Sequence, residues 1–599
     1  MRSDRRAIVG VVLLLASSCA IVPGGLDRFV FAKLLLAAAG AALGLSAPAT
    51  GRLPTSTQLC LAVGAVLLLA AALASSSPRI GLLGRQPLNN GILVLPVFVA
   101  AIVAGARMLG PDAPSSRRRL ALLTLAVVAL LVGGLAVLEA AGLRPFSSTS
   151  TRPGSLLGNA SDEGALAALL LGPLLAWAIS TRTPLAVAGA VGAAGTAVVS
   201  GSRGALLGTL ATLLVIVLTQ RTRRLLLAAG TGTGLLVVAL AVPATRARLL
   251  DLTPLAHHTV SGRVLLWRET LSLLSRHPLL GVGPSQFEVA IAGEHDRHWQ
   301  ASVGPANPPG SPHSWILQAA TAAGPALLVA ALVLAALVAR AGVRRWQTAR
   351  DPWARGALAG LTGYGVALLF HFPTPGTGLP ACVLAGSVLA VAARPEGAWA
   401  RRLRGASVTG LALLGLVYVA AGAAEIVLRH AVRDAGDGNL AAADRAFRDA
   451  RSLRPWDIDV GATALHAFVQ RATSGDAAAV PYAQRWTSAV RPIARDEQVL
   501  DNLAALQNAS GDPVASHRTL DGGLRSDPFN PQLLLLRGVD EIQEGQYAAA
   551  VTDLELVTAI DPGGWQAWND LAVAYGALHE PDRAAAAAET AGRLRNAAS

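Results

Sequence analysis

The sequence predicts an all-helical membrane protein, in which a polytopic bundle of about 13 membrane-spanning helices is followed by an α-solenoid of paired helical repeats. Three observations indicate this fold class. Apolar runs long enough to cross a bilayer recur through most of the chain, and arginines gather in the short segments between them. Near the C-terminus, a period of 34 residues replaces the apolar runs.

The composition points to an apolar solvent for most of the chain. The 599 residues are 53% hydrophobic and only 15% charged, with a mean hydropathy of +0.48, whereas soluble domains carry about 25% charged residues. The net charge of +13 could indicate nucleic-acid binding, but the arginines lie between apolar runs, which is typical of membrane topology. Cys19, Cys60 and Cys382 lie far apart inside apolar runs, so the sequence predicts neither a disulfide framework nor a metal site.

The candidate spans follow from the length of helix that crosses the hydrocarbon core, which is about 20 residues. The first span follows a basic segment and could be mistaken for a signal peptide. No small-residue cleavage site comes before the next apolar run, so we expect a retained helix. The predicted spans centre on 7–23, 29–46, 58–75, 90–108, 119–139, 163–180, 184–200, 204–219, 224–242, 314–339, 356–370, 378–393 and 406–428.

The placement of arginines predicts the orientation of the spans. With a cytoplasmic N-terminus, the inside segments hold about 21 arginines and the short outside segments only about 7 basic residues. We therefore expect a multi-pass protein of the cell (plasma) membrane. An odd number of spans then places the long loop 243–313 and the C-terminal domain outside the cytoplasm. The predicted division is a membrane domain over 1–428 and an extracytoplasmic repeat domain over 429–599.

The C-terminal domain shows the pattern of tetratricopeptide repeats. The helix signature W-x2-L-[G/A]-x2-Y of such a repeat is matched by Trp568, Leu571, Ala572 and Tyr575. The 34-residue period relates Ser516, Ala550 and Ala584. An earlier copy at 443–455 is out of register, which predicts an insertion or a degenerate repeat near 470–500. We expect the repeats to bind a protein partner or to pack against the membrane domain.

Three segments on the predicted outer side carry polar residues suited to chemistry. Residues 200–207 read S-G-S-R-G-A-L-L and place Arg203 at the membrane boundary. The loop contains Gly262-Arg263 and Trp267, followed by H-P-L-L-G-V-G at 277–283. Residues 312–317 read P-H-S-W-I-L and place His313 at the start of a long span.

In their order, spacing and shared side, these segments resemble those of the O-antigen ligase/O-antigen polymerase family of membrane glycosyltransferases. That family carries an S-x-S-R-G-A-L-type segment, then G-R-x3-W and H-P-x-x-G-x-G in an extracytoplasmic loop, then H-N-x-x-L at the next helix. The resemblance covers about residues 60–395. Two departures stand out: the family's His-Asn pair reads His313-Ser314, and Asp162 replaces the second asparagine of a G-N-x-N-x-x-A helix start at Gly158-Asn159.

The resemblance implies a glycosyltransferase of cell-surface polysaccharide assembly. Its partner would be a glycan on a polyprenyl-diphosphate carrier in the membrane, transferred to an acceptor hydroxyl without a nucleotide sugar. Arg203 and Arg263 would bind the diphosphate, because arginine is always charged and binds phosphate through two parallel hydrogen bonds. His313 would accept the proton of the acceptor hydroxyl. No D-x-D motif or metal-ligand cluster lies in the predicted outer loops of the membrane domain, so neither a metal nor another cofactor is expected.

Each of these residues also has a plainer explanation. Arg203 could extend to the membrane interface, Arg263 could be an ordinary loop arginine, and His313 could cap a helix. His277 belongs to a His-Pro turn and is expected to support the loop.

The sequence also contains secondary site candidates and is compatible with two competing functions. Arg85 in the first sizeable outer loop, Asn159 and His371 are the secondary candidates. A transporter of lipid-linked glycans would require intramembrane charges or paired broken helices, of which the sequence shows little. A non-catalytic anchor that presents a repeat scaffold is favoured by the serine after His313. The sequence does not decide between ligase and polymerase activity. It also does not specify the donor sugars, the acceptor (glycan, lipid or protein) or the partner of the repeats.

Overall fold

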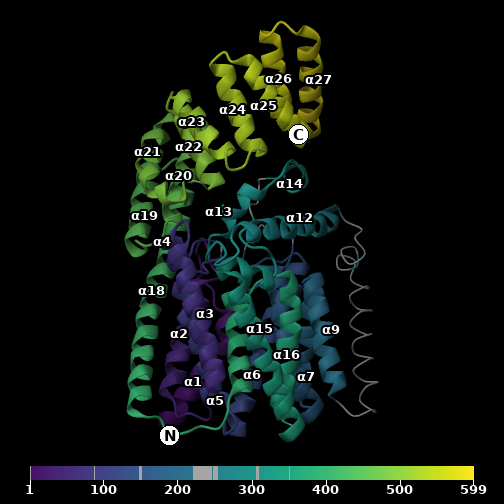
Figure 1. The fold of residues 1–599 in the computed structure, drawn as a ribbon, viewed down its shortest axis with the longest axis vertical. Coiled ribbons are helices and arrows are strands. Elements are labelled where there is room, and N and C mark those ends of the chain that lie inside the picture. Colours follow the sequence, from purple (N-terminus) through teal and green to yellow (C-terminus); the bar gives the residue numbers. More distant parts are fainter. Residues whose placement is uncertain are drawn as a thin grey trace.

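The computed structural model describes residues 2–86, 88–146, 152–219, 246, 254–304, 309–349, 351–494 and 496–598. Every regular element in these ranges is helical, and the extended backbone pairs there only in an isolated bridge between Arg52 and Val391. The predicted all-helical fold class is therefore confirmed. Figure 1 shows a helical bundle with the N-terminus at one end, and a stack of helix pairs beyond the other end.

The bundle helices coincide with the predicted spans. Among the described residues, 6 helices are long and apolar enough to cross a membrane, and 4 more apolar helices are shorter. The predicted span 224–242 lies outside the described residues, so the total of about 13 spans stays a prediction. The bundle comprises α1 (Arg2–Ala16), α2 (Phe31–Ser46), α3 (Thr55–Ala74), α5 (Leu95–Leu109), α6 (Ser115–Ala140), α7 (Ala160–Thr181), α8 (Pro184–Val199), α9 (Arg203–Leu218), α15 (Trp315–Ala349), α16 (Pro352–Ala367), α17 (Pro375–Leu389) and α18 (Ala398–Gly436).

Glycines let the central helices approach one another closely. A Cβ atom on Gly360 of α16 would lie 2.1 Å from the Leu169 carbonyl oxygen of α7, and one on Gly363 would lie 1.9 Å from Thr212 Oγ1 of α9. Small residues at such crossings are typical of membrane helices, whose association depends on close packing more than on the hydrophobic effect. This packing brings the ends of α7, α9 and α16 together.

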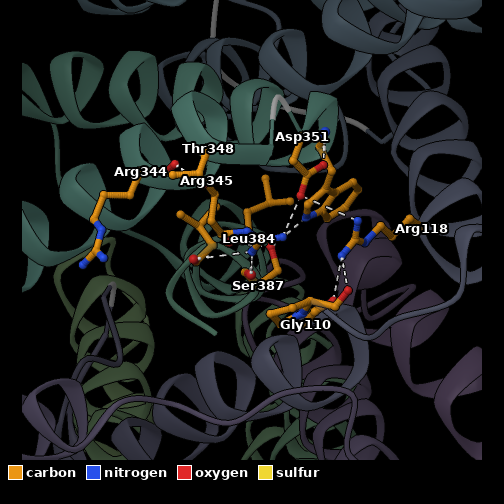
Figure 2. Close-up of polar contacts among 11 residues, drawn as sticks. Gly110, Arg118, Arg344, Arg345, Thr348, Asp351, Leu384 and Ser387 are labelled. Atoms are coloured by element: carbon orange, nitrogen blue, oxygen red, sulfur yellow. Dashed lines mark hydrogen bonds and ion pairs between the residues drawn. The ribbon is translucent and has the colours of Figure 1, made fainter. Parts of the chain in front are cut away.

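A polar network closes the bundle at the end of α15 that is remote from His313. Asp351, before α16, accepts a hydrogen bond from Arg345 at 2.7 Å and pairs with Arg118 of α6 at 3.6 Å. Arg345 also donates to the carbonyl of Ser387 in α17 at 2.6 Å. Figure 2 shows Arg345 and Arg118 directed toward Asp351, while Arg344 points away from this network. Of the two adjacent arginines in this predicted inside cluster, Arg345 therefore joins α15 to α17, and Arg344 does not.

The C-terminal domain is a series of helix pairs with the predicted period. Helices α22, α24 and α26 begin at Glu497, Pro531 and Trp565, which are 34 residues apart. The pairs are α22 (Glu497–Ala509) with α23 (Pro513–Leu524), α24 (Pro531–Gln543) with α25 (Tyr547–Ile560), and α26 (Trp565–Ala577) with α27 (Pro581–Ala598).

The earlier part of the domain departs from the regular repeat, as the sequence predicts. Helices α19 (Leu440–Leu453) and α20 (Asp459–Thr473) form normal elements. Three short pieces then occupy the region of the predicted insertion: η6 (Ala477–Ala479), α21 (Val480–Trp486) and η7 (Thr487–Ile493).

Helix α18 runs unbroken from the bundle into the repeat domain (Figure 1). The predicted division at 428/429 falls inside this helix, so no change of secondary structure marks it. On α18, Glu425 accepts a hydrogen bond from Arg454, and both side chains are completely buried.

The repeat domain is also held by the loop after α3, next to the short helix α4 (Pro78–Leu83). Arg85 lies 2.8 Å from Asp496 and 3.4 Å from Asp459, both of the repeat domain. All three side chains are buried or nearly so. The repeats therefore pack on the membrane domain, which was one of the two expectations for them.

Candidate functional site

The described part of the long loop before α15 folds into a small domain of its own. Its described helices are α12 (Pro254–Arg276), α13 (Phe287–Ile291) and α14 (Arg297–Ser302), with the one-turn helix η4 (Ala292–Glu294) between the last two. Figure 1 shows them between the bundle and the repeats, and Gln300 of α14 donates to Asp527 of the repeat domain at 2.7 Å. The loop's core consists of Leu265, Leu266, Leu273, Val282, Phe287, Ile291 and Trp299.

The H-P-L-L-G-V-G segment anchors this loop on a kink in α15. The Thr321 carbonyl accepts hydrogen bonds from the amides of Val282 at 2.8 Å and Gly283 at 3.3 Å. The kink includes Gly324, with φ of +75°, and a Cβ atom there would lie 2.0 Å from the Leu279 carbonyl oxygen. Only glycine combines this backbone conformation with so close an approach. The loop is therefore fixed within a few turns of His313.

A tryptophan joins the remaining motif segments. The Trp267 indole of α12 donates to the Pro312 carbonyl at 2.9 Å, directly before His313. The same indole ring lies 6.1 Å from the ring of Phe370, at the end of η5 (Leu368–Phe370). A Cβ atom on Gly204 would meet the Cβ of Phe370 at 3.2 Å. Segments far apart in the sequence thus meet where α9 and α15 begin.

Arg203 and Arg263 lie in this region with like charges close together. Arg203 is the first residue of α9, where the Ser202 side chain caps the helix by accepting from the Ala205 amide at 3.4 Å. Burial, and then the charge of Arg203, lower the pKa of Arg263. Within the described ranges, no carboxylate pairs with Arg263. Two neighbouring guanidinium groups in a partly buried place favour a bound anion between them.

His313 lies within electrostatic range of Arg263, in the left-handed backbone region with φ of +48°. Burial, together with Arg263 and His371, lowers the pKa of His313 to about 3, so its imidazole is neutral at physiological pH. Its Nδ1 atom is buried and has no hydrogen-bond partner among the described residues. Ser314, in place of the family's asparagine, is buried, and its carbonyl accepts from the Gln318 amide at 2.7 Å.

His371, predicted only as a secondary candidate, lies next to His313. The two rings are 6.2 Å apart, with 16° between their planes. His371 Nε2 is 3.1 Å from Asp162 Oδ1, and Thr374 donates to the same oxygen at 2.8 Å. The structure thus brings Arg203, Arg263, His313 and His371 together.

The other two secondary candidates have structural contacts instead. Arg85 forms the ion pairs with the repeat domain described above. Asn159 caps α7, where its side chain accepts from the Ser161 amide at 2.7 Å.

Asp162 was noted in the sequence only as a departure from a motif, and its link to His371 was missed. It is an acidic residue in the first turn of a predicted span, next to Glu163, and ionisable residues at such positions are functional candidates. Within the part of the chain that the structure describes, no group of three or more His, Cys, Asp or Glu residues is placed to hold a metal ion.

The apolar bundle, its folded loop and the repeat stack define a membrane protein with a cationic and imidazole-rich site at one end of the bundle. Residues 188–332 match the family model described as O-antigen ligase. This stretch contains Arg203, Arg263 and His313, and the resemblance predicted from the sequence is confirmed over it. The chain is therefore a membrane protein with an O-antigen ligase domain and tetratricopeptide-like repeats.

Similarity to solved structures is low. A MamA protein structure is 14% identical with a TM-score of 0.25, covering 29% of this chain and 92% of that one. Yeast Tom70 is 12% identical with a TM-score of 0.25, covering 70% of this chain and 86% of that one. No curated protein matches the sequence. The repeat assignment rests on the helix pairs described above.

Proposed function

We propose that this protein is a membrane glycosyltransferase that moves a glycan from a polyprenyl-diphosphate carrier to an acceptor hydroxyl on the extracytoplasmic face. The observation that carries the proposal is the meeting of Arg203, Arg263 and His313, from three separate segments of the ligase domain, at one end of the bundle. This end is the place where a lipid-anchored substrate meets the aqueous phase.

The arginine pair suits the leaving group. When the bond from the sugar to the carrier breaks, negative charge develops on the diphosphate, and fixed cations stabilise it. Arg203 and Arg263 lie within electrostatic range of each other, so both charges would act on a diphosphate bound there. Each guanidinium presents paired donors in a geometry that matches phosphate oxygens.

His313 suits the acceptor. A general base must be unprotonated before reaction, and the low pKa of His313 keeps its ring neutral. A diphosphate bound to Arg263 would offset the positive charge that disfavours the imidazolium, and so would promote proton uptake once the donor is in place.

The direct test is transfer by the purified full-length protein. The probe is the polyprenyl-diphosphate glycan extracted from the membranes of the producing cells, incubated with extracted lipid or glycan acceptors. We expect a slower-migrating glycosylated acceptor and release of polyprenyl diphosphate. His277→Ala, on the exposed turn of the same loop, is a matched control that should transfer normally. Failure of the wild-type protein to form any product would favour the scaffold function.

Removal of divalent metal should leave the rate of transfer unchanged. The proposed charge stabilisation comes from two arginines, which can replace the metal ion that many glycosyl and phosphoryl transfers use. The measurement is the transfer rate after treatment with EDTA, compared with a mock-treated sample. An activity lost in EDTA and restored by magnesium or manganese would contradict this prediction.

We also propose that the loop and the repeats lie outside the cytoplasm, since inside segments are rich in arginine. Ser474 and Ser526 are exposed in the repeats, and Ser116 is exposed beside a predicted inside cluster. In a cysteine-free background, S474C and S526C should react with an impermeant maleimide in intact cells, whereas S116C should react only after permeabilisation. The reverse pattern would overturn the orientation.

A further inference from the structure

The pair formed by Asp162 and His371 has the geometry of a proton acceptor. Asp162 comes from α7 and His371 from the turn after η5, and both residues are buried, with 6% and 3% of their surface exposed. A carboxylate oxygen only accepts hydrogen bonds, so the contact from Asp162 Oδ1 to Nε2 at 3.1 Å places the ring proton on Nε2. The lone pair of the neutral ring then lies on Nδ1.

Both neighbouring imidazoles leave a nitrogen available. Nδ1 of His313 and Nδ1 of His371 are buried and have no hydrogen-bond partner among the described residues. Buried polar atoms are nearly always paired, so each of these nitrogen atoms is expected to have a partner such as a water molecule or a substrate group. A substrate hydroxyl or a water molecule between the two rings would satisfy both nitrogen atoms.

The charges around the two rings differ. His313 faces Arg263, which opposes a positive imidazolium, whereas His371 contacts the carboxylate of Asp162 at 3.1 Å. Lys33 of α2 lies within electrostatic range of Asp162, and it is anchored by hydrogen bonds to the carbonyls of Ala20 and Leu156.

Building on the proposed function, we propose that the proton of the acceptor hydroxyl passes to His313 and then, through a water molecule between the two rings, to Nδ1 of His371, where the carboxylate of Asp162 faces the ring. The acceptor oxygen forms its bond to the anomeric carbon as its O–H bond breaks. The bond from that carbon to the diphosphate oxygen breaks at the same time, and its electron pair leaves with the diphosphate. His371 returns the proton to the departing diphosphate or to water. His371 is thus a catalytic residue, and Asp162 is a positioning residue.

The test separates kcat from KM with the extracted donor in the full-length protein. His371→Ala should lower kcat by about 10²–10⁴-fold, and Asp162→Asn by about 10²-fold, with KM for the donor changed by less than about threefold. Asp162→Glu, which keeps the carboxylate, should recover part of the rate. Added imidazole should restore transfer to His371→Ala and not to Asp162→Asn, because only the former has lost a ring.

Two further comparisons distinguish chemistry from folding. His295 forms a second buried pair with Glu269 at 2.8 Å, within the loop, so His295→Ala is a matched control for the loss of such a pair. It should affect thermal stability as His371→Ala does, yet keep kcat. The double variant His313→Ala/His371→Ala should be no slower than the slower single variant, because residues that act as one unit are not additive.

The outcomes separate this inference from the function on which it rests. If the wild type transfers glycan and both His371→Ala and Asp162→Asn keep its kcat, the proton acceptor is wrong and the proposed function stands. A slow His371→Ala that imidazole does not rescue, with losses that multiply in the double variant, would also overturn it. If the wild type transfers nothing, both proposals fall.

Discussion

Replacing His313 with alanine should lower single-turnover glycan transfer by about 10²–10⁴-fold and leave donor binding nearly unchanged. The expected difference between the effect on transfer and the effect on donor binding follows from the position of His313. It lies near the proposed diphosphate site but carries no charge that would hold a diphosphate, because burial and Arg263 lower its pKa to about 3. The alanine variant lacks a proton acceptor that acts in the transition state. The arginine pair still binds the diphosphate of the donor before reaction.

The measurement pairs two assays on variants that fold. Binding of a fluorescent polyprenyl diphosphate reports the diphosphate site, and rapid-quench transfer with excess enzyme reports the chemical step. His277→Ala serves as the control for loss of a loop histidine. Full transfer by His313→Ala would show that the assigned base is wrong, and the non-catalytic scaffold would become the better explanation of the site.

Arg203→Ala and Arg263→Ala should each weaken binding of polyprenyl diphosphate by about 10–100-fold, since a charge-assisted hydrogen bond contributes about 1.5–3 kcal/mol. Transfer should fall by at least as much, because the diphosphate gains charge as it leaves. Lysine at either position should recover only part of the affinity, since it keeps the charge and loses the two parallel donors.

The matched control is Arg268→Ala. Arg268 lies on the same helix as Arg263, but it is exposed and pairs with Asp296 at 2.6 Å. Its loss should change neither binding nor transfer. Normal donor binding and turnover in both Arg203→Ala and Arg263→Ala would place the diphosphate elsewhere, whatever the histidines do.

Most of the helices could be predicted from the sequence because their signals are local. A helix that crosses an apolar medium needs a long apolar run, and a stacked helix pair needs small residues at a fixed period. The boundary at 428/429 was harder to place in physical terms. The composition of the sequence changes there, as expected where a helix leaves an apolar medium for water, but such a change does not require the helix to end.

The site could be predicted only in part. Arg203, Arg263 and His313 belong to segments that are predicted to share one side of the membrane, so their approach could be expected. The partners of Arg85 and His371 could not be predicted, because these pairs form only through tertiary contacts. His371 meets Asp162 across 209 residues, and Arg85 meets Asp496 across 411, and no local pattern records such distances.

The repeats are attached rigidly to the bundle, and this attachment determines where a molecule bound to the repeats is held. Helix α18 is continuous, and the ion pairs of Arg85 and Arg454 tie the repeat domain to the bundle beside the loop. A molecule held by the repeats would therefore stay at a set distance from the ligase loop. Tethering of this kind raises the effective concentration of a bound molecule steeply when the distance matches its reach, and scarcely at all when it does not. The stack of repeats would then favour partners whose length matches the distance from the repeats to the loop.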